Sequence, residues 1–177
     1  MQPLGTQAPD FSLLDVVSGK TVSRDNAKGA AGLLVMFLCV HCPFVKHVEQ
    51  VIARFAGDYA GQGLGIVAIS SNDAENYPED SPEGMRAQAR RLGFAFPYLY
   101  DESQQVARAY GAACTPDFFL YDRDLRLVYR GQFDASRPSL NVPVTGNDLR
   151  RAVEALLAGK QPLEEQRPSL GCNIKWK

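Results

Sequence analysis

The chain has 177 residues, of which 45% are hydrophobic and 22% are charged. This length and mix suit one globular domain, residues 1–177, with a sizeable core. Nineteen basic and twenty acidic residues give a net charge of -1, so charge does not favour nucleic acid or an anionic membrane as a partner. No apolar run approaches the roughly 20 residues that span a bilayer, and the start does not resemble a signal peptide. We therefore expect a cytoplasmic protein.

The first half of the sequence predicts a hairpin and a βαβ unit. The run Phe11–Leu14, followed by the Ser18-Gly19 turn, indicates an N-terminal hairpin extension. Residues 32–38 are almost all apolar, which is typical of a central strand buried on both faces. Apolar residues then recur at helical spacing over residues 43–59, and residues 64–70 predict a second buried strand. The two strands should be parallel because a crossover helix joins them.

The second half predicts a loop and helix inserted between core strands, and then an antiparallel hairpin. Residues 72–82 are polar and rich in turn formers, and a helix with Ser81 as its N-cap should run from about Pro82 to Leu92. A short helix around Val106 should end at Gly111. Runs 118–121 and 125–129 favour an antiparallel hairpin. A capping box at Thr145 should open a last helix to Ala158, followed by a tail, 160–177, packed on the domain.

The pair Cys39 and Cys42 stands where a buried strand gives way to a helix. A thiol at a helix start lies beside unpaired N–H groups, which stabilise the thiolate that attacks disulfides. We therefore expect Cys39 to be the exposed, low-pKa nucleophile and Cys42 to be the resolving thiol. His41, as imidazolium, would further favour the thiolate. Two merely packed cysteines are the simpler interpretation, but the order strand, motif, helix argues against it.

A metal site is the other interpretation of the cysteines. A closed zinc site needs four ligands, and Cys114 and Cys172 stand alone rather than as a second pair. His41 and His47 leave zinc or copper open as an alternative, but we expect no metal and no cofactor.

A second marker is the segment Cys114-Thr115-Pro116. Proline entering a strand is unusual because it cannot donate to the ladder. The peptide bond before Pro116 is therefore either an ordinary trans bond at a strand start or a cis bond with a special role.

Taken together, these motifs resemble the thioredoxin-like superfamily, in its redoxin branch related to the AhpC/TSA peroxiredoxins. The start 5–13 is similar to redoxin domains, and Cys42-Pro43-Phe44 with the ending 171–176 resembles a peroxiredoxin-like subgroup. The resemblance implies an α/β thioredoxin-like fold with a central mixed sheet flanked by helices. It also implies a redox pair at Cys39 and Cys42, and a cis bond between Thr115 and Pro116 facing that pair.

The expected function is therefore thiol:disulfide exchange. The partners would be protein or small-molecule disulfides and a cellular thiol reductant. One departure is that thioredoxins carry a buried carboxylate in the strand before the pair, whereas residues 33–38 contain none, so no general base is assigned. Glu49 and Lys46 share a helical face, but a solvated pair is the simpler interpretation. A thiol peroxidase with Cys42 as the peroxidatic cysteine is the alternative, with Arg130 as the guanidinium beside its thiolate.

Two regions should adjoin the redox pair. Ligands sit at the carboxyl ends of parallel strands, so residues 72–81 should border the site, where Glu75, Glu79 and Asp80 would discourage acidic substrates. Cys114 should lie near Pro116, and the tail, anchored by Trp176, could bring Cys172 to the site edge. There Cys172 would pair with Cys114 or take oxidation from the Cys39–Cys42 disulfide. The simpler interpretation is that both cysteines only pack.

Overall fold

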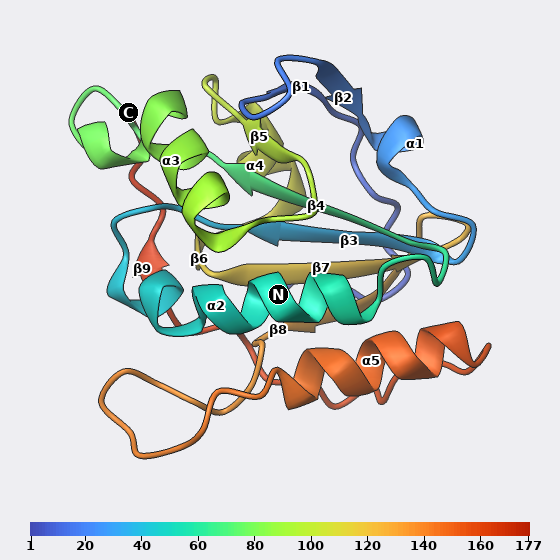
Figure 1. Cartoon of the computed structure of the whole chain (residues 1–177). Coiled ribbons are helices and arrows are strands. Elements are labelled where there is room, and N and C mark those ends of the chain that lie inside the picture. Colours follow the sequence, from blue (N-terminus) through green and yellow to red (C-terminus); the bar gives the residue numbers. More distant parts are fainter.

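The computed structural model describes all residues from Met1 to Lys177 and has a seven-stranded mixed sheet at its centre (Figure 1). The strand order is β2-β1-β5-β4-β3-β7-β8. The strands are β1 (Ser12–Asp15), β2 (Thr21–Ser23), β3 (Gly32–Phe37), β4 (Leu64–Ser70), β5 (Tyr98–Tyr100), β7 (Asp117–Asp122) and β8 (Leu127–Gly131). A separate two-stranded pair joins β6 (Cys114–Thr115) to β9 (Cys172–Asn173).

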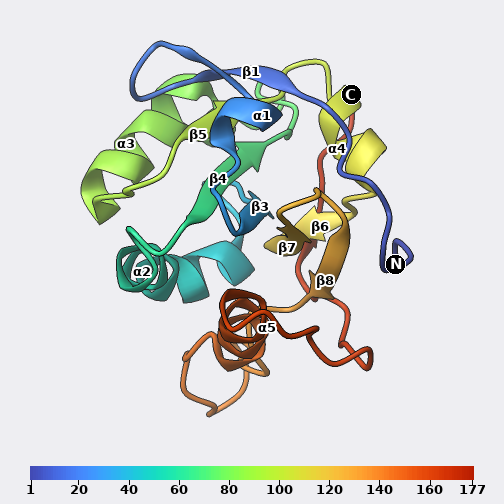
Figure 2. The ribbon, with the colours of Figure 1, turned by 90° about the vertical axis from the view of Figure 1, so that its right-hand side faces the viewer.

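The helices cover both faces of the sheet. They are α1 (Arg24–Ala27), α2 (Pro43–Asp58), α3 (Pro82–Leu92), α4 (Gln105–Tyr110) and α5 (Asn147–Leu157), with a short 3-10 helix η1 (Pro78–Asp80). Helices α2, α3 and α5 lie on one side of the sheet and α4 lies on the other (Figure 2). None of these helices is both long and apolar enough to cross a membrane.

Strand β3 is an inner strand of the sheet, between β4 and β7, and every one of its residues is buried. It pairs in parallel with β4, as the predicted βαβ unit indicated, and antiparallel with β7, a pairing that the sequence did not predict. Side chains alternate between the two faces of a strand. Leu34 and Met36 therefore face α2 and α5, whereas Leu33 and Val35 face α4.

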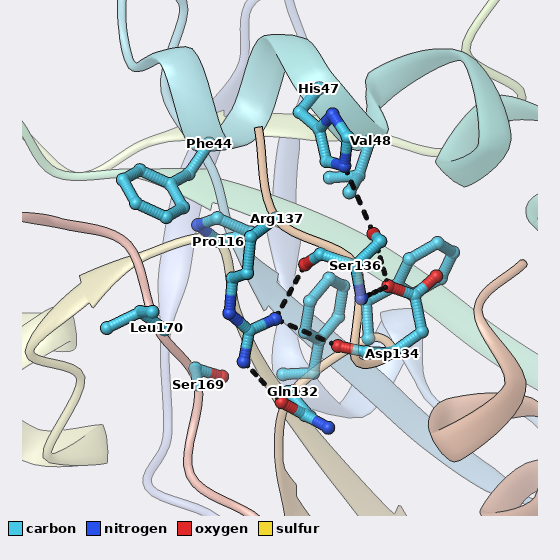
Figure 3. Close-up of a pocket in the computed structure, with 12 residues that line it drawn as sticks. Phe44, His47, Val48, Pro116, Gln132, Asp134, Ser136, Arg137, Ser169 and Leu170 are labelled. Carbon is cyan, nitrogen blue, oxygen red and sulfur yellow. Dashed lines mark hydrogen bonds between the residues drawn. The ribbon is translucent and has the colours of Figure 1, made fainter. Parts of the chain in front are cut away.

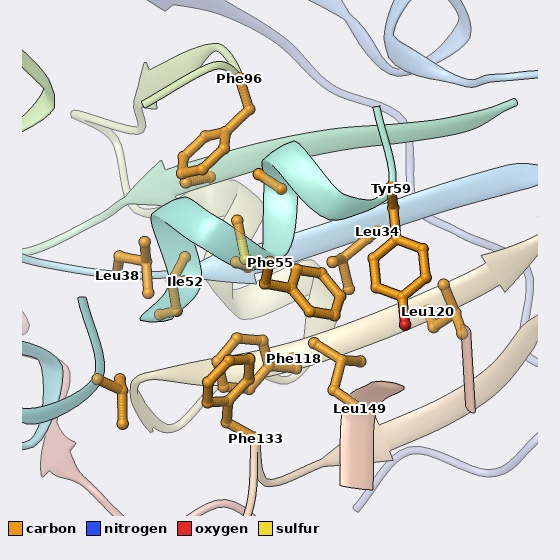
Figure 4. Close-up of a cluster of buried hydrophobic side chains, with 14 of the residues drawn as sticks. Leu34, Leu38, Ile52, Phe55, Tyr59, Phe96, Phe118, Leu120, Phe133 and Leu149 are labelled. Carbon is orange, nitrogen blue, oxygen red and sulfur yellow. The ribbon is translucent and has the colours of Figure 1, made fainter. Parts of the chain in front are cut away.

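Packing between α2, α5 and the sheet forms the larger of two hydrophobic cores (Figure 4). Phe55 of α2 is fully buried and its ring lies 5.8 Å from that of Phe133 and 4.9 Å from that of Tyr59. The hydroxyl of Tyr59 donates to Glu154 of α5, so this aromatic group ties the two helices together.

Several predicted elements are confirmed, and others were missed. The N-terminal hairpin, the helix after the cysteines, the α3 helix with its Ser81 cap and the β7–β8 hairpin are present. The short strands β5, β6 and β9 and the helix α1 were not predicted. The capping box at Thr145 is wrong: Gly146 is the N-cap of α5 and makes no side-chain cap. Instead the buried carboxylate of Asp134 accepts the N–H groups of Thr145 and Gly146.

The carboxyl ends of β3 and β4 point to the same edge of the sheet, where β6, β9 and the first turn of α2 gather (Figure 1). The chain segments that carry Cys39, Cys42, Thr115 and Cys172 therefore meet there, although they are far apart in sequence.

Replacing Phe55 with alanine should lower the free energy of unfolding by about 3–5 kcal/mol, because the buried ring leaves a cavity among aromatic neighbours. Urea unfolding measures the change. Leu163→Ala is the control, because Leu163 is 81% exposed and a surface substitution should change stability by less than about 0.5 kcal/mol. Equal losses in the two variants would contradict this view of the core.

Candidate active site

The two cysteines of the motif lie in the turn between β3 and α2, and both are fully buried. Cys42 is the N-cap residue of α2, and Pro43 is the first helical residue. Cys39 precedes the cap by three residues. The prediction of an exposed Cys39 at the helix start is therefore wrong: the chain makes a further turn after β3, so that Cys42, not Cys39, stands at the positive end of the helix dipole.

The thiols of Cys39 and Cys42 converge on Thr115. The sulfur of Cys39 lies 3.2 Å from the Thr115 hydroxyl, and the thiol of Cys42 donates to the Thr115 carbonyl oxygen at 3.5 Å. The peptide bond from Thr115 to Pro116 is cis, as the resemblance implied. The sheet thus brings the residue before Pro116 into contact with both sulfurs.

A buried carboxylate, that of Asp80, holds the turn between the cysteines. Its Oδ1 accepts the backbone N–H groups of Val40 at 2.7 Å and His41 at 3.1 Å. Its Oδ2 accepts the side-chain amide of Asn72 at 3.0 Å and hydrogen-bonds to Nδ1 of His41. The segment 72–81 therefore borders the site, as predicted. Asp80, however, is fully buried and cannot repel acidic substrates as expected; Glu75 and Glu79 are the exposed acids.

The thiol of Cys39 is held in its protonated form. Burial, and then the nearby charge of Asp80, raise the pKa of Cys39 to about 11, against the opposing effect of the Thr115 hydroxyl and of the N–H groups of Cys42 and His41. Loss of hydration and a nearby negative charge both disfavour a thiolate. The prediction of a low pKa at Cys39 is thus wrong as well.

The imidazole of His41 is fixed on both sides. Its ring stacks on Tyr77 with a centroid separation of 5.3 Å and an interplanar angle of 14°, while Asp80 binds Nδ1. The ammonium of Lys175 also lies over the ring of Tyr77, 5.8 Å from its centroid. His41 is therefore linked through Tyr77 to the C-terminal tail.

A second set of hydrogen-bonded side chains contacts the backbone of Cys39. The side-chain amide of Gln88 donates to the Cys39 carbonyl at 3.1 Å and to Glu49 at 3.0 Å. Tyr98 donates to the carbonyl oxygen of the Gln88 amide at 2.8 Å. Glu49 is buried and also accepts from Arg91, so the expected solvated pair with Lys46 is wrong. No local pattern signals this group, because its members come from α2, α3 and β5.

The C-terminal tail pairs with the residue that contacts both sulfurs. In the antiparallel β6–β9 pair, Thr115 stands opposite Cys172 and Cys114 stands opposite Asn173. Cys172 packs against the buried cluster of Cys39, Cys42 and Val45. All four cysteines of the chain are free thiols, and the sulfurs of Cys42 and Cys172 lie within reach of each other. The structure thus places Cys172 beside Cys39 and Cys42, as the prediction that the tail brings Cys172 to the edge of the site had stated.

Cys114 lies on the other side of the β6–β9 pair from Cys172. Neighbouring residues of a strand point to opposite faces, and the sulfur of Cys114 contacts the Pro116 carbonyl oxygen at 3.8 Å. It lines a cavity of about 150 Å³ together with Asp117 and Arg130. Burial raises the pKa of the Cys114 thiol to about 12. The alternative of a direct Cys114–Cys172 bond is therefore disfavoured by the register.

Arg130 is not brought to the redox pair. It lies on β8, where its Nε donates to the carbonyl of Gln2 at 2.8 Å and its Nη1 donates to Gln166 at 2.7 Å. The arginine expected for a peroxidase is thus engaged with the N-terminus and the tail.

A small cavity of about 20 Å³ lies between α2, Pro116 and the loop after β8 (Figure 3). Arg137 spans it and donates to the carbonyls of Asp134 and Ser136 and to the side chain of Gln132. His47 contacts the Ser136 hydroxyl at 3.2 Å. The volume suffices for about one water molecule, and the guanidinium already has its partners. The cavity beside Pro116 is therefore too small to be a ligand site.

The mixed sheet, the helices on both of its faces and the thiol pair beside a cis proline define a thioredoxin-like protein. The same fold occurs in a putative thiol:disulfide interchange protein DsbE from Chlorobium tepidum, with a TM-score of 0.69 and 20% identity over 89% of this chain and 99% of that one. Residues 4–130 match the AhpC/TSA family, and the chain belongs to that family.

Two further relatives differ in how closely they match. An uncharacterized conserved protein from Geobacillus kaustophilus is 57% identical, with a TM-score of 0.98 over 100% of this chain and 94% of that one. The thiol-disulfide oxidoreductase ResA of Halalkalibacterium halodurans is 26% identical over an aligned stretch that covers 70% of this chain and 65% of ResA. This chain thus spans less than two thirds of the length of that relative.

The Asp80 carboxylate should shift the ionisation of Cys39. In Asp80→Asn the amide oxygen still accepts from Val40 and His41 but the charge is gone, so the pKa of Cys39 should fall below about 11 while burial keeps it above the value of a free thiol. Peptide-resolved labelling with iodoacetamide over a pH series measures it. Glu79→Gln, which removes an adjacent exposed charge, should leave the labelling profile unchanged. Rapid labelling of Cys39 at neutral pH in the wild type would refute the assignment.

Asp117, directly after Pro116, should make stability depend on pH. Burial raises its pKa from 3.8 to about 6, so between these values the folded chain holds a proton that the unfolded chain has lost. Stability conferred by the protonated form therefore falls as pH rises through this window, by about 3 kcal/mol in all, at 1.36 kcal/mol per pKa unit. Asp117→Asn should remove this component, so urea unfolding at about pH 4.5 and about pH 7.5 should show a smaller difference than in the wild type. Identical differences in the two proteins would contradict it.

Proposed function

We propose that the chain is a thiol:disulfide oxidoreductase in which Cys42 reacts with the disulfide of a protein or small molecule and Cys39 is the second thiol of the pair. The single observation that carries the proposal is the convergence of both sulfurs on Thr115, beside the cis proline and at the N-terminus of α2. The name of the ResA relative supports the same class of reaction.

The assignment of Cys42 as the attacking thiol follows from its place in the helix. Cys42 is the N-cap residue of α2 and stands at the positive end of the helix dipole, which favours a thiolate there. Its sulfur makes no cap hydrogen bond, and its thiol donates to the Thr115 carbonyl oxygen. Cys39 is as buried as Cys42, but it also lies near Asp80, whose charge adds to the effect of burial in raising the pKa of Cys39. A thiolate at Cys42 would attack a substrate sulfur, and the leaving sulfur would depart with the electron pair of the broken S–S bond.

Asp80 and His41 position the reacting turn. Four hydrogen bonds to one carboxylate fix the backbone between the two cysteines, which holds their sulfurs on Thr115. In this proposal both residues act by positioning and do not touch the substrate.

A thiol peroxidase is the second candidate, because the chain belongs to the AhpC/TSA family and Cys42 is followed by Pro43 at a helix start. The same cysteine would then attack hydrogen peroxide. Since Arg130 is held elsewhere, the structure favours disulfide exchange.

Reduction of a protein disulfide with dithiothreitol as the electron source tests the proposal. Cys42→Ser should lower turnover to the background rate, whereas Cys114→Ser, on the other side of the β6–β9 pair, should retain it. Hydrogen peroxide is offered in a parallel assay. Peroxide turnover that depends on Cys42, with no disulfide reduction, would replace the proposal with the peroxidase, and full disulfide turnover in Cys42→Ser would overturn both.

A further inference from the structure

The C-terminal tail covers the redox pair and carries a thiol of its own. Cys172 packs on the cluster of Cys39, Cys42 and Val45, and neither Cys39 nor Cys42 has any exposed surface. A substrate therefore cannot reach Cys42 while the tail is in this place.

Backbone and side-chain bonds hold the tail there. The N–H of Ile174 donates to the Ala113 carbonyl at 3.1 Å, and the side chain of Ile174 is buried in the core beneath α4. The N–H of Lys175 donates to Asn72 at 2.9 Å, the same residue that binds Asp80. Cys172 is thus positioned by the residues on either side of the pair.

The residue before Cys172 has no room for a side chain. A Cβ on Gly171 would lie 2.0 Å from the Thr115 carbonyl oxygen, far inside van der Waals contact. This close approach lets β9 pair with β6, with Cys172 packed against the cluster that contains Cys42.

A contact between Arg108 and Trp176 holds the end of the tail. The guanidinium of Arg108 lies 4.2 Å from the ring of Trp176, a cation–π distance, and the N–H of Lys177 donates to Gln104 at 3.0 Å. Because these contacts do not involve the sulfurs, the tail has its own means of docking when the thiols are reduced.

From this arrangement we propose that Cys172 is a third redox thiol, which resolves the mixed disulfide on Cys42 and locks the docked tail over the site through a Cys42–Cys172 disulfide. This inference rests on the proposed function. It assigns to the tail a catalytic part and a redox-dependent cover, and it makes Cys39 an alternative partner of Cys42 rather than its sole partner.

The chemistry needs no further oxidant than the substrate disulfide. Cys42 thiolate first attacks one substrate sulfur, and the other leaves as a thiolate that takes up a proton. Cys172, as thiolate after giving its proton to solvent, then attacks the Cys42 sulfur. The bond from Cys42 to the substrate sulfur breaks, its electron pair leaves on that sulfur, and a proton completes the second product thiol. The substrate gains two electrons, and Cys42 and Cys172 lose them.

Disulfide mapping after reaction with excess oxidised glutathione tests this step. Trypsin leaves Cys39 and Cys42 together on residues 29–46, Cys114 on residues 109–123 and Cys172 on residues 161–175. We expect a link between peptides 29–46 and 161–175 in the wild type. The link should persist in Cys39→Ser, which identifies Cys42 as the bonded residue, and in the matched control Cys114→Ser. It should be lost in Cys172→Ser.

A variant at Gly171 tests the same step while all four cysteines are kept. Gly171→Ala forces the tail away from Thr115 and should slow formation of the link by about tenfold or more, because the effective concentration of Cys172 at Cys42 falls. Gly57→Ala is the control: Gly57 lies in α2 with open space around its Cα, so the link should form at the wild-type rate.

Hydrogen exchange of residues 171–177 provides a second readout. Oxidation should slow exchange of these amides in the wild type and in Cys39→Ser, and leave it unchanged in Cys172→Ser. Turnover of disulfides with only a 39–42 bond, and with full activity in Cys172→Ser, would overturn the role of Cys172 while leaving the proposed function intact. Absence of any disulfide and of any turnover would instead overturn the proposed function.

Discussion

The site depends on one buried carboxylate, that of Asp80. A carboxylate without solvent must be satisfied by donors, and here the donors are the two backbone N–H groups between the cysteines, the His41 ring and the Asn72 amide. The need of this carboxylate for donors has two structural consequences. It orders the turn that carries Cys39 and Cys42, and it anchors the loop after β4 to that turn. The same charge adds to burial in raising the pKa of Cys39, so this one group acts on both the geometry of the turn and the ionisation of its first thiol.

Thr115 is the second point at which distant segments meet. It contacts both sulfurs of the motif and pairs with Cys172 of the tail. Asn72 links the Asp80 group to the tail through Lys175. The loop, the motif and the tail therefore share hydrogen bonds, and displacing the tail removes bonds from the surroundings of Cys42 as well. This coupling is why a thiol on the tail is well placed to respond to the oxidation state of the motif.

Much of the architecture could be predicted from the sequence, because it follows from apolar periodicity and local caps. The apolar run 32–38 favours a strand buried on both faces, and Ser81 before Pro82 marks a helix start that needs no tertiary contact. Strands β6 and β9 could not be found this way. Each has two residues, and each exists only because the other lies beside it. The capping box at Thr145 failed for a related reason: Asp134, eleven residues earlier, supplies the oxygen that the local motif was expected to supply.

For the site, the sequence by itself determined the pair Cys39 and Cys42, the Thr115–Pro116 marker and the nearness of the loop 72–81, since each follows from motif spacing or from where parallel strands end. Only the tertiary structure decided which thiol caps the helix, that Asp80 turns inward, that Glu49 joins Gln88 and not Lys46, and that Cys172 meets Cys42 while Cys114 points away. These features depend on burial and strand register. Burial decides whether a carboxylate or thiol loses its water, and a shift of one residue in register reverses the face of every side chain. Neither quantity is encoded in a local stretch of chain.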